Sequence, residues 1–243
     1  MFEPRHYRKL MQQPDLVSFR VCLAETDLYI AAACDLSARA LAAVRDARSQ
    51  IEAEILRDAR FLKSLEPLPV RTDAPPVARA MYEAAEQAGV GPMAAVAGAV
   101  AQFVGRALAE VSANVIVENG GDIFLQTTVE RIVGVHAGQS PLSGRIGLRI
   151  PAHNALGICT SSATVGPSLS FGNADAGLIV AHDAAFADAA ATTLANLVKT
   201  PADVQRAVDR LLELPGVRQA LVIIGETMGV GGEFELVPLS PQS

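Results

Sequence analysis

Two apolar, strand-like runs joined by a very short glycine turn constrain this chain more than any other feature. Residues 113–117 and 123–127 have the composition of extended strands, and residues 118–122 (Glu-Asn-Gly-Gly-Asp) connect them. Asn-Gly is the strongest short-range signal for a tight hairpin turn, because glycine readily adopts positive φ. The sequence therefore predicts an antiparallel hairpin. The same turn would present bare backbone N–H groups beside two carboxylates, so a ligand-binding loop is the alternative interpretation.

Composition limits the class of protein further. Half of the 243 residues are apolar, which is enough for a sizeable core. The net charge is −6 and no basic stripe with interleaved aromatic residues occurs, so nucleic acid is not an expected partner. The longest charge-free apolar stretch, residues 90–105, is too short for a bilayer span and predicts a buried helix. The polar, basic N-terminus does not resemble a signal peptide, and we expect a cytoplasmic protein without membrane contact.

The three cysteines carry little functional information. Cys22, Cys34 and Cys159 are not arranged in a C-x-x-C or Cys/His pattern. A disulfide framework and a structural zinc site are therefore not expected, and Cys159 is predicted to be a small buried residue.

Strands and helices occur in separate blocks along the chain. A first hairpin is predicted at residues 16–24 and 28–33, and a long amphipathic helix runs from there to residue 62. Two more helices follow, one ending at Gly89 and one beginning at Pro92. After the glycine turn, strands are expected at residues 131–135, 145–150, 156–159, 176–181, 219–225 and 233–237, with helices at 184–198 and from 201 to about 214.

This order predicts an α+β fold with mainly antiparallel sheets and paired helices. We expect a single domain over residues 1–243. Because a strand–helix–strand order occurs twice, an internal duplication with halves of about 1–130 and 131–243 is an alternative description. A G-x-G-x-x-G after the first strand and a G-x-x-x-x-G-K-[ST] motif are both absent, which disfavours Rossmann and P-loop folds.

Two further segments have the composition of a binding site. Residues 157–164 place four hydroxyls after a predicted strand, where they either bind a phosphate or ribose or satisfy their own loop backbone. Asp188 and Thr192 are four residues apart at the start of a predicted helix and share one face. A carboxylate and a hydroxyl on one face can hold Mg²⁺. The alternative is that Asp188 only stabilises the helix N-terminus.

Together these segments resemble the ApbE-like family, flavin transferases that attach FMN from FAD to a Thr or Ser of an acceptor protein. The family carries, in the same order, Gly-Gly-Ile-Ala, Asn-x-Gly-Gly-Asp, Ala-Thr-Ser-Gly and Ala-Asp-Ala-x-Ala-Thr. The resemblance covers about residues 85–200. The counterparts in this chain are Gly91-Pro92-Met93-Ala94, Glu118-Asn119-Gly120-Gly121-Asp122, Cys159-Thr160-Ser161-Ser162 and Ala187-Asp188-Ala189-Ala190-Ala191-Thr192.

The resemblance implies a T-fold-related architecture and a site for FAD and Mg²⁺. By this resemblance the side chains of Asp188 and Thr192 and a backbone carbonyl near Ala94 are the metal ligands. The residues implied to bind the flavin nucleotide are Glu118, Asn119, Gly120, Gly121, Asp122, Thr160, Ser161 and Ser162. The implied partners are a small-molecule nucleotide and an acceptor protein, and an alanine-rich, apolar composition is compatible with a homodimer.

The chain departs from the family at the residue that assists proton removal. The transferases place His-x-x-Asp-Pro after the Ser-Gly loop, whereas residues 167–172 here read Pro-Ser-Leu-Ser-Phe-Gly. A positioned base typically contributes two to four orders of magnitude in rate, so no catalytic residue is assigned. The sequence therefore favours a flavin or nucleotide and Mg²⁺ site with an unknown reaction. The alternatives are an active FMN transferase with a substitute base, His153 or Asp122, and a non-catalytic binding module.

Overall fold

The computed structural model of the chain describes residues 13–162 and 172–239. Its middle layer is an eight-stranded sheet with the order β1-β2-β3-β4-β7-β8-β9-β10, in which all neighbours are antiparallel. A second sheet has the order β11-β6-β5. The strands are β1 (Val17–Leu23), β2 (Thr26–Ala32), β3 (Val115–Asn119), β4 (Asp122–Thr127), β5 (Arg131–Gly134), β6 (Ile146–Ile150), β7 (His153–Ser161), β8 (Ala176–Ala181), β9 (Val217–Ile224), β10 (Thr227–Gly232) and β11 (Glu235–Pro238).

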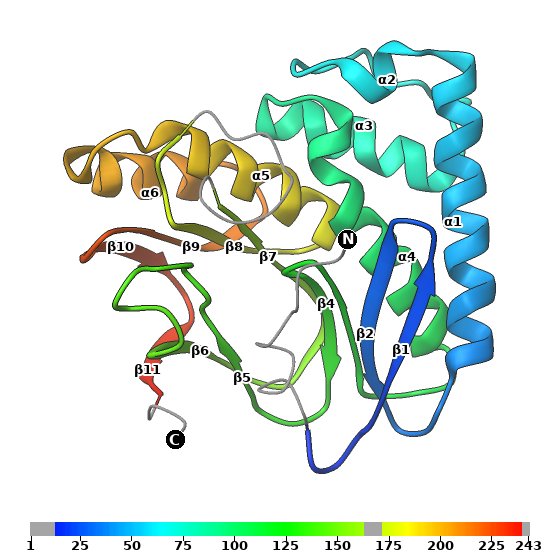
Figure 1. The fold of residues 1–243 in the computed structure, drawn as a ribbon, viewed down its shortest axis with the longest axis horizontal. Helices are drawn as coiled ribbons and strands as arrows, with labels where there is room; N and C mark the ends of the chain where they lie inside the picture. Colours follow the sequence, from blue (N-terminus) through cyan, green and yellow to red (C-terminus); the bar gives the residue numbers. More distant parts are fainter. Residues whose placement is uncertain (1–12, 163–171, 240–243) are drawn as a thin grey trace.

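The helices cover one face of the large sheet, and the small sheet lies on the other (Figure 1). Two hydrophobic cores result, one between helices and sheet and one between the two sheets. The helices are α1 (Ser37–Arg57), α2 (Arg60–Lys63), α3 (Pro76–Ala88), α4 (Val96–Ala109), α5 (Ala184–Leu197) and α6 (Val204–Leu212), with short 3₁₀ turns η2 (Pro92–Ala95) and η3 (Pro201–Asp203). The predicted α+β class with mainly antiparallel sheets is confirmed.

The chain order follows one pattern twice. Strands β1 and β2 lead into α1 to α4 and then into β3 and β4; β7 and β8 lead into α5 and α6 and then into β9 and β10. Consecutive strands of each set are neighbours in the sheet, so short hairpins and helical connections suffice to build it. Strands β5 and β6 leave the large sheet between the two sets and form the small sheet with β11.

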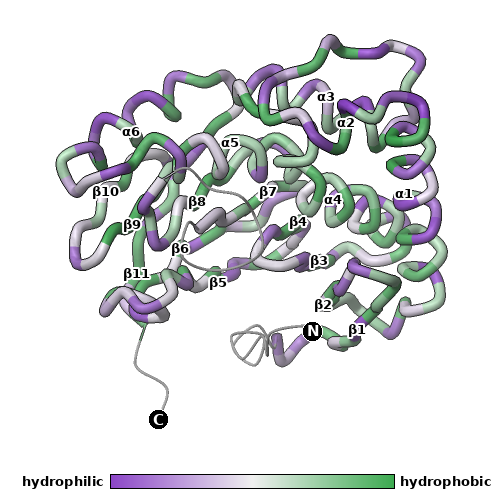
Figure 2. Tube along the Cα trace, turned by 45° about the horizontal axis from the view of Figure 1, so that its top comes forward, coloured by the Kyte–Doolittle hydropathy of each residue, from purple (hydrophilic) through white to green (hydrophobic). Residues whose placement is uncertain are grey.

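Helices α4 and α5 form the inner part of the helical layer. In Figure 2 they are mainly white to green, whereas purple segments are frequent along α1 and α6. Their small residues allow close contact: a Cβ added to Gly98 would lie 2.0 Å from the Ala184 carbonyl oxygen. The stretch Pro92–Ala109 is long and apolar enough to cross a membrane by length and composition. Its buried residues pack in the helix-side core, as the sequence predicts for residues 90–105.

Some predicted helix ends agree with the structure and others differ. The helix predicted to run to residue 62 ends at Arg57, because the next residue, Asp58, has an extended backbone, and α2 follows as a separate helix. Gly89 ends α3 in the left-handed conformation with φ 74°, as predicted. The residue before α1 is Leu36, without a side-chain cap, and the Asp35 carboxylate accepts a hydrogen bond from Ser37 N at 2.8 Å. Strand β10 was not predicted, because its sequence is rich in glycine. Its glycines let α6 pack closely, since a Cβ on Gly229 would lie 2.4 Å from the Val204 side chain.

Candidate functional site

The glycine turn is a tight hairpin between β3 and β4. Asn119 pairs directly with Asp122, and the ladder continues to Val115 and Gln126. Gly120 has φ 72° and Gly121 has φ 110°, which L side chains rarely adopt. The hairpin prediction is therefore confirmed. Because its two glycines have no side chains, a ligand can approach the backbone of this turn closely.

The residues of this turn point to opposite faces of the sheet. Asn119 lies on the helix face, because its Nδ2 donates to the Ala97 carbonyl at the start of α4, 3.1 Å away. Asp122 is directly opposite Asn119 and shares that face. Side chains alternate along a strand, so Glu118 lies on the face of the small sheet. Its buried carboxylate accepts a hydrogen bond from Gly121 N at 2.8 Å and thereby stabilises the turn.

Asp188 connects α5 to the start of α4. It lies one turn into α5, is 9% exposed, and its Oδ2 accepts a hydrogen bond from Gly98 N at 2.9 Å. Burial raises the pKa of Asp188 to about 7, against the lowering effect of the Gly98 and Ala97 backbone N–H groups. A carboxyl group with this pKa changes its protonation state near neutral pH.

Asp122 is the second buried carboxyl group on this face. Its pKa lies well above the usual range, first because of burial and then because of the negative charge of Asp188. The Cys159 thiol and the Thr160 backbone N–H act in the opposite direction but do not compensate. Within the part of the chain that the structure describes, Oδ1 of Asp122 has no hydrogen-bond partner. The carboxyl groups of Asp122 and Asp188 therefore lie close to each other beneath α5, and one oxygen of Asp122 is unpaired.

Two buried side chains fix the beginning of α5 above this position. Gln102 of α4 accepts a hydrogen bond from Ala184 N through Oε1 at 2.6 Å. The Cys159 thiol of β7 donates to the Ala184 carbonyl at 3.4 Å. Asp183 caps the helix by accepting from Phe186 N at 2.7 Å. Sequence reasoning missed Gln102, and the only available signal was a polar residue within an apolar, alanine-rich helix.

The predicted hydroxyl residues divide between the two faces. Cys159 belongs to the helix-side core, so alternation places Ser161 on that face and Thr160 on the other. Ser161 is buried and Ser162 half-buried. Residues 163–171, which include most of the segment aligned with the family's His motif, lie outside the described residues.

The predicted metal ligands belong to elements that touch one another. Helix α5, which carries Asp188 and Thr192, contacts η2, which carries Ala94. Thr192 is half-buried, follows Asp188 by one helical turn, and its hydroxyl makes no hydrogen bond within residues 13–162 and 172–239. In these same ranges, no group of three or more His, Cys, Asp or Glu side chains could hold a metal. Carboxylate, hydroxyl and carbonyl oxygens are nevertheless the ligands that hard cations such as Mg²⁺ prefer. The unpaired Oδ1 of Asp122 is an oxygen of this kind.

His153 lies far from this position. It is the first residue of β7 and pairs with Thr127, whereas Ser161 is the last. Eight residues of extended chain span roughly 26 Å. The Nε2 atom of His153 accepts from Arg218, which also binds Glu233 through its guanidinium. Of the two substitute bases considered, only Asp122 lies near Asp188.

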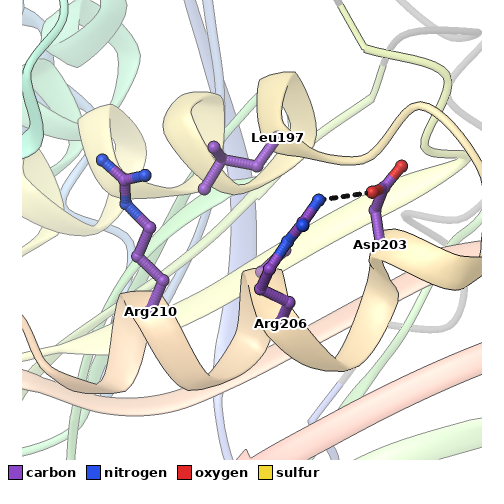
Figure 3. A pocket seen from close by; sticks show the side chains of 5 residues that line it. Leu197, Asp203, Arg206 and Arg210 are labelled. Carbon is purple, nitrogen blue, oxygen red and sulfur yellow. Dashed lines mark hydrogen bonds and ion pairs between the residues drawn. The ribbon is translucent and has the colours of Figure 1, made fainter.

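A separate pocket lies between the end of α5 and α6. Its volume is about 280 Å³, and the side chains of Arg206 and Arg210 rise from α6 beside Leu197 of α5 (Figure 3). Arg206 is paired with Asp203 at 2.7 Å. Leu197 is nine residues beyond Asp188, about 13 Å along the helix axis, so this pocket is distinct from the carboxylate pair.

The arrangement of an antiparallel sheet covered by helices matches the fold of solved ApbE structures. The flavin transferase ApbE from Vibrio cholerae matches with a TM-score of 0.60, covering 93% of this chain and 97% of that one at 13% identity. The ApbE protein from Thermotoga maritima matches with a TM-score of 0.58, covering 90% and 96% at 12% identity. At these identities the likeness concerns the fold.

Sequence comparison identifies the family. The family model described as AbpE bacteria matches residues 8–215. A UPF0280 protein of Methanocella arvoryzae is 48% identical over 189 residues, 77% of each chain. The UPF0280 protein MK0206 of Methanopyrus kandleri is 41% identical over 224 residues, covering 89% of this chain and 91% of its own. The chain belongs to the AbpE bacteria family, and the resemblance drawn from its motifs is confirmed.

Proposed function

We propose that this protein binds a flavin nucleotide, FAD, together with Mg²⁺ between the β3–β4 turn and the first half of α5. One observation carries the proposal. The buried carboxyl groups of Asp122 and Asp188 lie on the same face of the sheet, next to a turn whose two glycines have positive φ. An apolar core of this kind has no structural need for two buried carboxyl groups. A ligand that brings a cation gives them a function.

Each residue has a distinct part in this proposal. Asp188 and Thr192 hold the cation through their side chains, with the backbone carbonyl of Ala94 as a third ligand. The hydrogen bond from Gly98 N holds Oδ2 of Asp188 in place, so the orientation of Oδ1 is also fixed. When bound, the cation neutralises the nucleotide pyrophosphate and polarises it.

The nucleotide would lie along the β3–β4 turn and the end of β7. Gly120 and Gly121 leave room for phosphate or ribose oxygens because they carry no side chains. Asn119 keeps its amide on the Ala97 carbonyl and so holds the turn against α4. We place the nucleotide against the full predicted set, Glu118, Asn119, Gly120, Gly121, Asp122, Thr160, Ser161 and Ser162, with Glu118 acting through the turn it supports.

A second candidate function is transfer of FMN to an acceptor protein. In that reaction the acceptor hydroxyl oxygen bonds to the FMN phosphorus, the bond to AMP breaks, and a base takes the hydroxyl proton. Asp122 favours this candidate, because burial and the charge of Asp188 raise its pKa above the usual carboxyl range, which makes its carboxylate a stronger base. His153 does not, because it begins β7 at the end remote from Ser161.

The remaining parts of the proposal concern the molecule as a whole. We propose a single domain that arose by duplication, supported by the repeated order of two strands, helices and two strands. We further propose a cytoplasmic location, a homodimer and, for the transferase candidate, an acceptor protein as partner.

Calorimetry tests the binding proposal. FAD, FMN and ATP are titrated into the wild-type protein and the Asp188→Ala variant, each with Mg²⁺ and with EDTA. We expect binding of FAD that requires Mg²⁺ in the wild type and is lost in the variant. Metal-dependent binding that is unchanged by Asp188→Ala, or no flavin binding at all, contradicts the proposal.

A mass measurement separates the two candidates. The protein is incubated with FAD, Mg²⁺ and a peptide that carries an acceptor Thr. A peptide that gains the mass of FMN shows transfer, and Asp122→Asn should then lower the rate by two orders of magnitude or more. Bound FAD without a modified peptide favours binding with a different reaction.

A further inference from the structure

We propose that Oδ1 of Asp122 is a second carboxylate ligand of the divalent cation, so that the cation links strand β4 to helix α5. The inference rests on the proposed function, because it specifies how that site holds its metal. The family resemblance places Asp122 with the nucleotide and gives the metal only Asp188, Thr192 and a carbonyl near Ala94. The assignment of Asp122 to the cation comes from the contacts of this chain.

The sheet register brings Asp122 beneath Asp188. Ile123 pairs with Ile158 across β4 and β7, so Asp122 is next to Cys159. The Cys159 thiol donates to the Ala184 carbonyl at 3.4 Å, and Asp188 follows Ala184 by four residues, about one helical turn. Asp122, Cys159 and Asp188 therefore lie at one level between the sheet and α5, and the charge of Asp188 acts on Asp122.

The carboxylate of Asp122 has too few hydrogen-bond donors for its two oxygens. The residue is 7% exposed, and Oδ1 has no hydrogen-bond partner within the described ranges. The groups that act on this carboxylate are the negative charges of Asp188 and Glu118, the Cys159 thiol and the Thr160 N–H. Among the described residues, no Lys or Arg belongs to the groups with the largest effects on the pKa values of Asp122 and Asp188.

A buried carboxyl oxygen without a partner, close to a second carboxyl group, is neutralised either by a proton or by a cation. A divalent cation is suited to this, since carboxylate oxygens are the preferred ligands of Mg²⁺ and Mn²⁺. With Asp122 included, the cation would be held by two carboxylates from two different elements. Binding would then draw β4 and α5 together and remove the repulsion between the two residues.

Mn²⁺ binding tests the inference independently of any activity. Binding of Mn²⁺ is measured by calorimetry and by its electron paramagnetic resonance signal, with and without FAD. The proteins are the wild type, Asp122→Asn, Asp188→Asn and the control Asp183→Asn. Asp183 is five residues before Asp188, and Asn serves equally well as an N-cap, so the control removes a nearby charge without removing a proposed ligand.

We expect Asp122→Asn to weaken Mn²⁺ binding by more than about 100-fold, because the loss of a carboxylate ligand should exceed the 10- to 100-fold loss that outer-shell changes typically cause. Asp183→Asn should stay within twofold of the wild type. If Asp122→Asn binds Mn²⁺ like the wild type while Asp188→Asn does not, Asp122 is not a ligand and the proposed function stands. If the wild type binds no divalent cation, the proposed function itself fails.

A second variant covers the case in which Asp122→Asn folds poorly. Asp122→Cys replaces a hard oxygen ligand with a thiolate, which prefers softer metals. We expect this variant to bind Cd²⁺ more tightly than Mn²⁺ relative to the wild type, which already contains Cys159. An unchanged ratio of Cd²⁺ to Mn²⁺ affinity overturns the inference, because a residue outside the coordination shell does not alter metal preference.

Discussion

Asp188→Asn should remove a pH-dependent loss of stability of about 3 kcal/mol that Asp188 contributes in the wild-type protein between pH 5 and pH 8 in EDTA. Burial raises the pKa of Asp188 from 3.8 in the unfolded chain to about 7. The folded protein therefore binds this proton more tightly than the unfolded chain does. Stability is highest while Asp188 is protonated in the folded state, decreases as pH rises above 3.8, and levels off above about 7.

The magnitude follows from the size of the shift. Each pH unit between the two pKa values changes the free energy of unfolding by about 1.4 kcal/mol. Between pH 5 and the folded pKa, this amounts to about 3 kcal/mol of lost stability. The change is an upper bound where the neighbouring Asp122 shares the proton. Removing the Asp188 charge also lowers the pKa of Asp122, which flattens the dependence further.

Urea denaturation at pH 5, 6, 7 and 8 in EDTA measures the effect. Asp188 alone should cost the wild type about 3 kcal/mol over this range. Asp188→Asn should lose correspondingly less stability, while the pKa of Asp122, raised mainly by burial, contributes to the pH dependence of both proteins. Asp209→Asn, on the outer side of α6, is the matched control and should retain the wild-type slope. Equal slopes for the wild type and Asp188→Asn would refute the assignment of a raised pKa to this buried carboxyl group. Saturating Mg²⁺ should reduce the wild-type slope, because the cation favours the charged form.

Three further substitutions test the surrounding architecture. Gly121→Ala should destabilise by about 1–3 kcal/mol, because φ 110° is strained for an L side chain; an unchanged urea midpoint would contradict this. Tyr82→Phe removes the hydroxyl that donates to buried Glu54 at 3.0 Å and should lower stability by about 1–3 kcal/mol with an unchanged denaturant slope. Arg131→Met removes two 2.6 Å contacts to Asp15 and should speed amide hydrogen exchange before β1. Arg131 lowers the pKa of Asp15. The wild type should therefore show the same faster exchange only as pH falls through that pKa, because protonated Asp15 loses its ion pair.

Local signals in the sequence were sufficient for most elements. Positive-φ glycines mark the end of α3 at Gly89 and the β3–β4 turn, because few other residues adopt that backbone. Apolar periodicity separated strands from helices, and the order of four short motifs indicated the family. Strand β10 was not predicted, because its glycines have low strand propensity. The close contact of α6 with Gly229 explains why glycine occurs there.

The composition of the site was also predictable, but its arrangement was not. The sequence by itself determined that a glycine turn, a hydroxyl cluster and an Asp-Thr helix start occur in a family-like order. Only the tertiary structure decided that Asp122 and Asp188 meet, that Glu118 lies on the opposite face, and that His153 is at the far end of β7. The physical reason is that side chains alternate along strands, so register and sheet order, which depend on long-range packing, select the residues that share one face.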